Sequence, residues 1–249
     1  MNKIKNNVPN AITCLNLACG VLAIIALFYP DIFNAVLQRF VSGISFENYE
    51  AAFALILLGA VADLLDGMVA RAIHAVSAIG KELDSLCDLV TFGVAPALTM
   101  FVVARDMQSE ALWPLALVLV PVAGALRLAR FNVDDSQATT FRGLPIPASA
   151  LFWIGAAVWM KENHPLMPAV AKVAIVVFMA WLMVSPLRMF SFKVHGWSLR
   201  NAWAQYLLII IAVVAFCAMG PASLLVTVVA YVLLSVVWSI VNRKRAGAA

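Results

Sequence analysis

Charge is scarce in this sequence. Only 12% of the 249 residues are charged, whereas 64% are hydrophobic and the mean hydropathy is +0.95. A soluble domain is about half apolar and a quarter charged, so this chain has too little polar surface to fold in water. It is predicted to be an integral membrane protein, and its apolar runs leave no room for a separate soluble catalytic domain. Any chemistry must therefore be carried out by residues in or beside the bilayer.

Cysteine and histidine are also scarce, with four Cys and three His. The cysteines lie in or at the edge of apolar runs, without the paired spacing of a zinc site or a reason to form disulfides, and are expected to be packing residues. Their positions are Cys14, Cys19, Cys87 and Cys217. The net charge of +4 could suggest nucleic acid, but the basic residues stand at the ends of apolar segments, so no nucleic-acid partner is expected.

Apolar runs of spanning length occur eight times. A transmembrane helix needs about 20 mostly apolar residues. The predicted spans are 11–29, 51–71, 82–104, 112–129, 144–160, 168–188, 203–219 and 221–241. The chain, 1–249, is therefore predicted to be a single all-α membrane domain, a polytopic bundle of about eight helices. The first run lacks a small-residue cleavage site, so it is expected to be a span and not a cleaved signal peptide.

The basic residues predict the orientation, because cytoplasmic loops retain Lys and Arg during insertion. With the N-terminus inside, the cytoplasmic segments hold thirteen of the 17 Lys and Arg. These are Lys3, Lys5, Arg71, Lys81, Arg127, Arg130, Arg142, Arg188, Lys193, Arg200, Arg243, Lys244 and Arg245. The other side has Arg39, Arg105, Lys161 and Lys172. Both termini are therefore predicted to be cytoplasmic.

The outer loop after the first span has apolar residues at helical spacing with polar residues between them. They are Ile32, Phe33, Val36, Leu37 and Phe40. This pattern predicts a short helix that lies in the membrane interface.

Four aspartates interrupt the apolar pattern of the second and third spans. Asp63 and Asp66 are three residues apart, so they share one face of a helix. Asp84 and Asp88 are four apart and share a face of the next helix. Intramembrane carboxylates are costly and usually functional, and like charges in a low dielectric need compensating cations. Oxygen ligands without His or Cys suit Mg, Mn or Ca.

Small residues and one arginine surround these carboxylates. Gly67, Ala70 and Gly80 would let a ligand approach the backbone, and Arg71 can hold a phosphate by charge-assisted hydrogen bonds. Divalent ions beside an arginine are equipped for phosphoryl transfer, so the residues predict a diphosphate pocket. Structural pairing of the acids with basic side chains, for which too few bases are near, and divalent-cation transport are the alternatives.

Residues 63–88, DLLDGMVARAIHAVSAIGKELDSLCD, have the form D-x2-D-G-x2-A-R-x8-G-x3-D-x3-D. This pattern resembles the signature of the CDP-alcohol phosphotransferase family, whose members exchange the CMP of a CDP-linked lipid for an alcohol. The resemblance implies two divalent ions, Mg or Mn, held by Asp63, Asp66 and Asp84 with help from Asp88. It also implies that Asp88 is the general base for the acceptor hydroxyl. The residues implied to frame the CDP group are Asp63, Asp66, Gly67, Ala70, Arg71 and Gly80.

Further segments resemble one branch of the family, the phosphatidylserine synthases. They are VPNAITCLNLACG (8–20), GKELDSLCDLVTFGVAPA (80–97), RLARFNV (127–133), FRGLPIPA (141–148) and SPLRMFSFK (185–193). This resemblance implies that CDP-diacylglycerol and L-serine react to phosphatidylserine and CMP, at a site facing the cytoplasm of a bacterial inner membrane. The alternative acceptors are glycerol 3-phosphate, inositol phosphate and choline.

Basic residues on the predicted cytoplasmic side are candidates to bind lipid phosphates or an acceptor carboxylate. Arg127 and Arg130 are preferred, because residues three apart at a helix end can share one face. Positive-inside bias alone is the competing explanation for such residues. Capping of the first span explains Asn10 and Thr13, although both could also approach the nucleotide. The other basic candidates are Arg142, Arg188 and Lys193.

Small residues in the second and third spans allow close helix packing, either within the chain or at the seam of a homodimer with a second copy. They are Gly59, Ala60, Gly93 and Ala95.

Overall fold

The computed structural model describes residues 2–39, 46–73, 77–107, 112–133, 141–190 and 202–246. Its helices and two short strands follow one another in this order: α1 (Asn2–Phe28), α2 (Pro30–Gln38), α3 (Asn48–Ala72), α4 (Ala78–Asp88), η1 (Leu89–Val94), α5 (Ala95–Asp106), η2 (Trp113–Val118), α6 (Leu119–Val133), β1 (Phe141–Arg142), α7 (Ile146–Asn163), α8 (Ala169–Val184), β2 (Arg188–Met189), α9 (Trp203–Met219), η4 (Gly220–Ala222) and α10 (Ser223–Ala246). The predicted polytopic helical bundle is therefore confirmed.

Helices occupy the positions of all eight predicted spans. Among the described residues, five helical stretches are long and apolar enough to cross a membrane: Val8–Phe28, Tyr49–Ala72, Ala78–Asp106, Trp113–Val133 and Trp203–Val241. The last stretch contains both α9 and α10, which meet at a turn where Gly220 has φ +54°. Helix α8 is apolar but shorter, and α7 ends in charged residues. The number of membrane crossings therefore stays a prediction.

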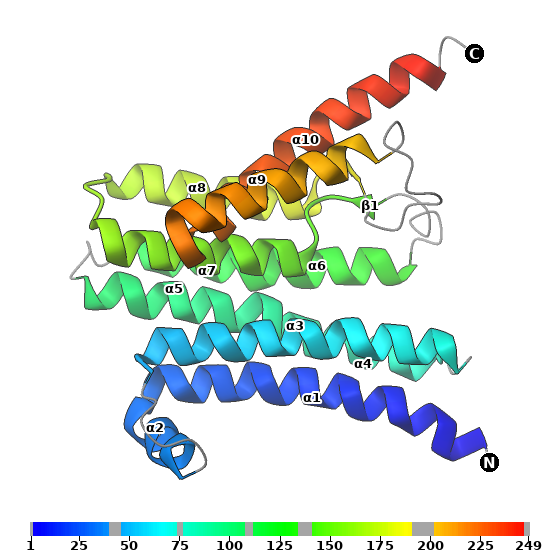
Figure 1. Ribbon diagram of the computed structural model, residues 1–249, viewed down its shortest axis with the longest axis horizontal. Coiled ribbons are helices and arrows are strands. Elements are labelled where there is room, and N and C mark those ends of the chain that lie inside the picture. Colours follow the sequence, from blue (N-terminus) through cyan, green and yellow to red (C-terminus); the bar gives the residue numbers. More distant parts are fainter. Residues whose placement is uncertain are drawn as a thin grey trace.

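Helices α1 and α3 form one outer layer of the bundle, and α9 and α10 form the opposite outer layer (Figure 1). Helices α5, α6 and α7 lie between these two layers. Both chain termini lie at the same end of the bundle, where α3 and α6 also finish. Helix α4 begins at this end as well, and the ends of α5 and α7 lie at the other end. This agrees with the predicted segregation of basic residues, while the side facing the cytoplasm stays a prediction. Lys193 and Arg200 lie outside the described residues.

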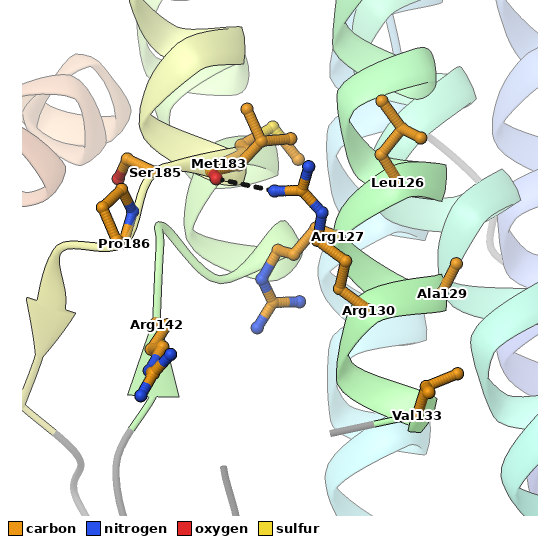
Figure 2. Close-up of a pocket in the computed structure, with 10 residues that line it drawn as sticks. Leu126, Arg127, Ala129, Arg130, Val133, Arg142, Met183, Ser185 and Pro186 are labelled. Atoms are coloured by element: carbon orange, nitrogen blue, oxygen red, sulfur yellow. Dashed lines mark hydrogen bonds between the residues drawn. The ribbon is translucent and has the colours of Figure 1, made fainter. Parts of the chain in front are cut away.

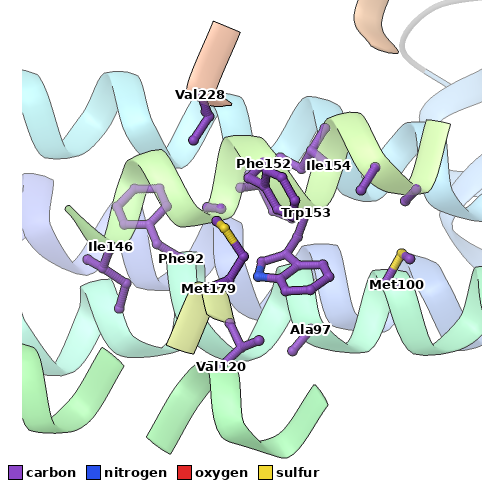
Figure 3. Close-up of a cluster of buried hydrophobic side chains, with 14 of the residues drawn as sticks. Phe92, Ala97, Met100, Val120, Ile146, Phe152, Trp153, Ile154, Met179 and Val228 are labelled. Atoms are coloured by element: carbon purple, nitrogen blue, oxygen red, sulfur yellow. The ribbon is translucent and has the colours of Figure 1, made fainter. Parts of the chain in front are cut away.

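Helix α7 lies in the apolar core (Figure 3). Buried side chains occur all around it, as expected of a helix enclosed by other helices and unlike one with a single apolar stripe. Phe152 and Trp153 pack edge to face, with ring centroids 5.1 Å apart. Phe92, Met100 and Met179 reach the same cluster from η1, α5 and α8. This core fixes the positions of the helices that carry the polar residues of the site.

The third predicted span is one continuous rod but not one regular α-helix. Residues Leu89–Val94 form a π-helix between α4 and α5, and the Ala95 amide donates to the Val90 carbonyl, five residues earlier. Pro96 lacks an amide hydrogen and its ring would meet the carbonyl of Phe92 in a regular α-helix, which the wider turn relieves. Such π segments are frequent at functional sites. Here the segment begins directly after Asp88.

A short helix, α2, is present in the predicted outer loop, while its location in the membrane interface stays a prediction. Ile32 and Val36 are exposed on it, as an interfacial helix requires. Asn34 ties it to the chain before α3, since its amide donates to the Phe46 carbonyl at 2.9 Å and its Oδ1 accepts from the Phe46 amide at 3.0 Å. Phe40 lies outside the described residues.

The packing expectation for the cysteines is correct for two of the four. Cys19 and Cys87 are buried and free, whereas Cys14 and Cys217 are exposed on the helix surface. An apolar run predicts that a residue lies in the membrane, but it does not distinguish the core from the lipid face.

The small residues of the second and third spans serve packing within the chain. A Cβ at Gly59 would overlap the Thr91 side chain, so this glycine lets α3 approach η1. Gly93 and Ala95 are buried, and Ala60 packs against the core. They therefore do not form an exposed seam in this bundle. A homodimer stays a prediction, and these residues do not support it.

Candidate active site

Three of the four predicted aspartates form one cluster. Helices α3 and α4 run in opposite directions (Figure 1), and their facing sides bring Asp63, Asp66 and Asp84 together. One carboxylate oxygen of each lies within 4.8 Å of the others. Asp66 is only 5% exposed, and the other two are partly buried. The spacing in the sequence placed each pair on one helix face, and the packing of α1 against both α3 and α4 holds the two helices near each other.

The cluster has the properties expected of a site for a divalent cation. Asp66 Oδ2 and Asp84 Oδ1 are buried without a hydrogen-bond partner. Across the described part of the chain, the ion pairs are Arg105–Asp106 and Lys161–Glu47, neither of which includes these acids. Buried carboxylates without a basic partner need another cation, and an all-oxygen ligand set suits Mg or Mn. This observation disfavours structural pairing, the alternative weighed from the sequence.

Asp88 has a different environment from the other three. It is the last residue of α4, one turn deeper than Asp84, and is 7% exposed. It is not part of the cluster within 4.8 Å. Instead, the Asn16 side-chain amide donates to Asp88 Oδ1 at 3.1 Å. Asn16 was not a predicted site residue, although its spacing from Asn10 and Thr13 along the first span was a signal that could have identified it.

A cavity of about 520 Å³ opens beside the cluster. Five of the six residues predicted to frame CDP line it, and Asp63 belongs only to the adjoining aspartate cluster. We call it the nucleotide cavity, lined by Pro9, Asn10, Thr13, Asp66, Gly67, Ala70, Arg71, Ser77, Ala78, Gly80, Lys81, Asp84 and Phe131. The structure also corrects the prediction that Asn10 and Thr13 cap the first span. Helix α1 begins at Asn2, so Asn10 and Thr13 lie inside a helix and do not cap it.

A second cavity of about 670 Å³ lies between α6, β1 and the end of α8 (Figure 2). We call it the arginine pocket, lined by Leu126, Arg127, Ala129, Arg130, Val133, Arg142, Met183, Val184, Ser185 and Pro186. Arg127 is only 8% exposed, and its Nε has no hydrogen-bond partner. Arg130 Nη1 donates to the Val184 carbonyl at 3.0 Å. Three arginines around one cavity are suited to a phosphate or a carboxylate.

The arginine pocket is assembled from segments far apart in the sequence. Strands β1 and β2 pair antiparallel, with Arg142 opposite Arg188. Gly143 has φ +74°, and its amide donates to the Leu187 carbonyl at 2.8 Å. The strings RLARFNV, FRGLPIPA and SPLRMF therefore meet at one place. Arg188 is exposed and outside the lining, and Lys193 is outside the described residues.

Asp88 lines neither cavity, but it interacts with charged residues of both regions. Its carboxylate is an electrostatic neighbour of Asp63 and Asp84 and of Arg127. Helix α6 contributes to both cavities, because its Phe131 lines the nucleotide cavity and its Arg127 lines the arginine pocket.

The sequence matches the CDP-alcohol phosphatidyltransferase family over residues 6–187. The chain belongs to this family. This is the family that the signature at 63–88 predicted, and its members are enzymes that use divalent metals. The match covers both cavities and ends before α9, so α9 and α10 lie beyond it.

Curated relatives resemble the chain over most of its length. A protein of Bacillus subtilis (strain 168) is 35% identical over 191 residues, which cover 77% of this chain and 94% of that protein. One of Helicobacter pylori (strain J99) is 34% identical over 181 residues, covering 69% and 76%. One of Mycobacterium bovis is 34% identical over 234 residues, covering 89% and 73%. All three are named CDP-diacylglycerol–serine O-phosphatidyltransferase.

Proposed function

We propose that this enzyme transfers the phosphatidyl group of CDP-diacylglycerol to the hydroxyl of L-serine, giving phosphatidylserine and CMP. The observation that carries the chemistry is the cluster of Asp63, Asp66 and Asp84, with two unpartnered buried oxygens, at the edge of the nucleotide cavity. The names of the three relatives support serine as the acceptor.

The aspartate cluster and the nucleotide cavity divide the binding of CDP between them. Arg71 and the small residues Gly67 and Ala70 line the cavity, so a diphosphate can approach the backbone and be held by the guanidinium. Divalent ions held by Asp63, Asp66 and Asp84, with help from Asp88, would neutralise the diphosphate and stabilise the charge on departing CMP. The diacyl tails of the substrate stay in the bilayer between helices.

Asp88 is the proposed general base. The serine hydroxyl oxygen forms a bond to the phosphorus that carries diacylglycerol, and the bond from this phosphorus to the bridging oxygen of CMP breaks. Asp88 accepts the hydroxyl proton, and CMP leaves with the electron pair of the broken bond. The place of Asp88 outside the cluster of three aspartates supports this role, because a base must contact the acceptor hydroxyl whereas a ligand need only contact metal.

The arginine pocket is the proposed site for the acceptor carboxylate or the lipid phosphate. Arg127 is buried with a free Nε, a costly arrangement for a side chain that serves only membrane topology. Arg130 and Arg142 bring two further positive charges to the same cavity. The same charges would suit a phosphorylated acceptor such as glycerol 3-phosphate, which is the second candidate.

The acceptor can be identified directly. Purified protein is incubated with CDP-diacylglycerol, Mg or Mn, and one alcohol from a panel of serine, glycerol 3-phosphate, inositol phosphate and choline, and the lipid product is identified by mass. We expect phosphatidylserine. Faster CMP release with glycerol 3-phosphate than with serine would overturn the acceptor and leave the family chemistry standing. Metal uptake without CMP release would instead favour a divalent-cation transporter.

We also propose that the site faces the cytoplasm of a bacterial inner membrane. Both cavities lie near the bundle end that holds the two termini. Arg71, Lys81 and Arg130 also belong to this end, and cytoplasmic loops are rich in Lys and Arg. A cysteine-accessibility experiment in sealed inner-membrane vesicles tests this orientation. A cysteine added after Ala249 should react only with a thiol reagent that reaches the cytoplasmic side.

A further inference from the structure

We infer that Asn16 is a positioning residue that orients the carboxylate of Asp88. This inference deepens the proposed function, because it depends on Asp88 acting as the base. The observation behind it is a hydrogen bond between two buried side chains that are 72 residues apart in the sequence. Asn16 Nδ2 donates to Asp88 Oδ1 at 3.1 Å.

The chemistry of the two groups explains why an asparagine suits this place. An ionised carboxylate accepts hydrogen bonds only, so its neighbour must donate. A lysine or arginine would also donate, but its charge would form an ion pair and hold the proton-accepting oxygen. An amide donates to one oxygen without adding charge, which leaves Asp88 Oδ2 for the acceptor hydroxyl.

The surroundings of Asn16 fix its side chain. Asn16 is fully buried, and the Thr91 hydroxyl donates to its backbone carbonyl at 3.0 Å. A Cβ on Gly59 would lie 3.1 Å from Asn16 Oδ1, so this amide oxygen faces the closely packed backbone of α3. With Oδ1 on that side, Nδ2 faces Asp88.

Packing alone does not account for this residue. Asn16 Oδ1 is buried without a hydrogen-bond partner, and such a group costs free energy that an apolar side chain of similar size would not. Within the described part of the chain, Asp88 is the one hydrogen-bond partner of the Asn16 side chain. Because α1 carries Asn16 and α4 carries Asp88, the bond also fixes the base relative to the helix whose Asn10 and Thr13 line the nucleotide cavity.

A double-mutant cycle tests the inference in the purified enzyme with saturating Mg. Asn16→Ala should lower kcat roughly 10- to 100-fold, the value of a hydrogen bond to a charged group, and leave the KM for CDP-diacylglycerol within about twofold. In an Asp88→Asn background the same substitution should change kcat by less than about twofold, because the carboxylate that it orients is gone. Asn16→Ser, which keeps a shorter donor in the buried site, should lose less than Asn16→Ala.

Thr99→Val is the matched control. It removes a buried hydroxyl that donates to the Ala95 carbonyl of its own helix at 2.8 Å and is not bonded to Asn16 or Asp88, so kcat should stay within about twofold. An equal loss from Asn16→Ala in both backgrounds, or no loss in either, overturns the positioning role. If Asp88→Asn alone keeps full turnover, it is the base assignment that fails. Should Asn16→Ala not fold, the cycle is run with Asn16→Ser and judged by the same comparison.

Discussion

Replacing Asp84 and Asp88 by asparagine should separate two kinds of carboxylate in one helix. Asp84 belongs to the cluster within 4.8 Å, whereas Asp88 lies one turn deeper and accepts from Asn16. Asp84→Asn removes one charged oxygen ligand. It should therefore raise the Mg or Mn concentration needed for half-maximal activity and also lower turnover. Asp88→Asn should leave the affinity for CDP-diacylglycerol, and much of the metal binding, intact while turnover collapses.

The expected size follows from the roles. A general base contributes roughly 100- to 10,000-fold in rate, which is about 2.7 to 5.5 kcal/mol of transition-state stabilisation at about 1.36 kcal/mol per tenfold. Neither substitution should unfold the protein, because each removes one negative charge from a group of mutually repelling acids.

The assay combines CMP release, binding of CDP-diacylglycerol and a Mg titration on both variants. Thermal inactivation in detergent is the control, and both variants should match or exceed the wild type there. Equal losses of CDP-lipid binding and turnover in the two variants would refute the distinction. Asp88 would then be only a further metal ligand, and the base would lie elsewhere.

Four further substitutions test other parts of the site and fold. Asp63→Asn and Asp66→Asn should each lose several kcal/mol of transition-state stabilisation, and near wild-type CMP release at saturating metal would remove that residue from the site. Arg130→Gln should raise the KM for serine or for CDP-diacylglycerol about tenfold or more, and unchanged values for both would leave Arg130 without a substrate role. Gly143→Ala should destabilise the protein by at least about 2 kcal/mol, because a Cβ there would overlap a backbone carbonyl in addition to the strain of φ +74°. Gly220→Ala, with φ +54° and open space around it, is the control and should lower the thermal midpoint less.

Local patterns predicted the parts of the site that lie within one helix. The spacing of Asp63 and Asp66, and of Asp84 and Asp88, fixes their common faces, because a helix repeats every 3.6 residues wherever it lies. Arg71, four residues beyond Gly67 on the same helix, could likewise be assigned to the same region. The structure brings these residues to one cluster and one cavity.

Contacts between distant segments could not be predicted in this way. Asn16 stands in an apolar run with no local sign of its partner, and it was not assigned a role. Arg142 was assigned only by the side of the membrane, and Arg130 by that side and by its spacing from Arg127, whereas their shared cavity depends on the pairing of β1 with β2. The π-helix after Asp88 depends on how Pro96 is accommodated, and it was expected to be ordinary helix.

The sequence by itself determined the membrane class, the helices and the family, because these depend on composition, on the 3.6-residue period and on a motif of fixed spacing. The tertiary structure alone decided that Asp88 lies outside the cluster of three aspartates and that Asn16 donates a hydrogen bond to Asp88. It also decided that three distant segments form the arginine pocket. The physical reason is that helix periodicity is a property of neighbouring residues. The choice of packing partners, in contrast, depends on many weak contacts summed over the whole bundle.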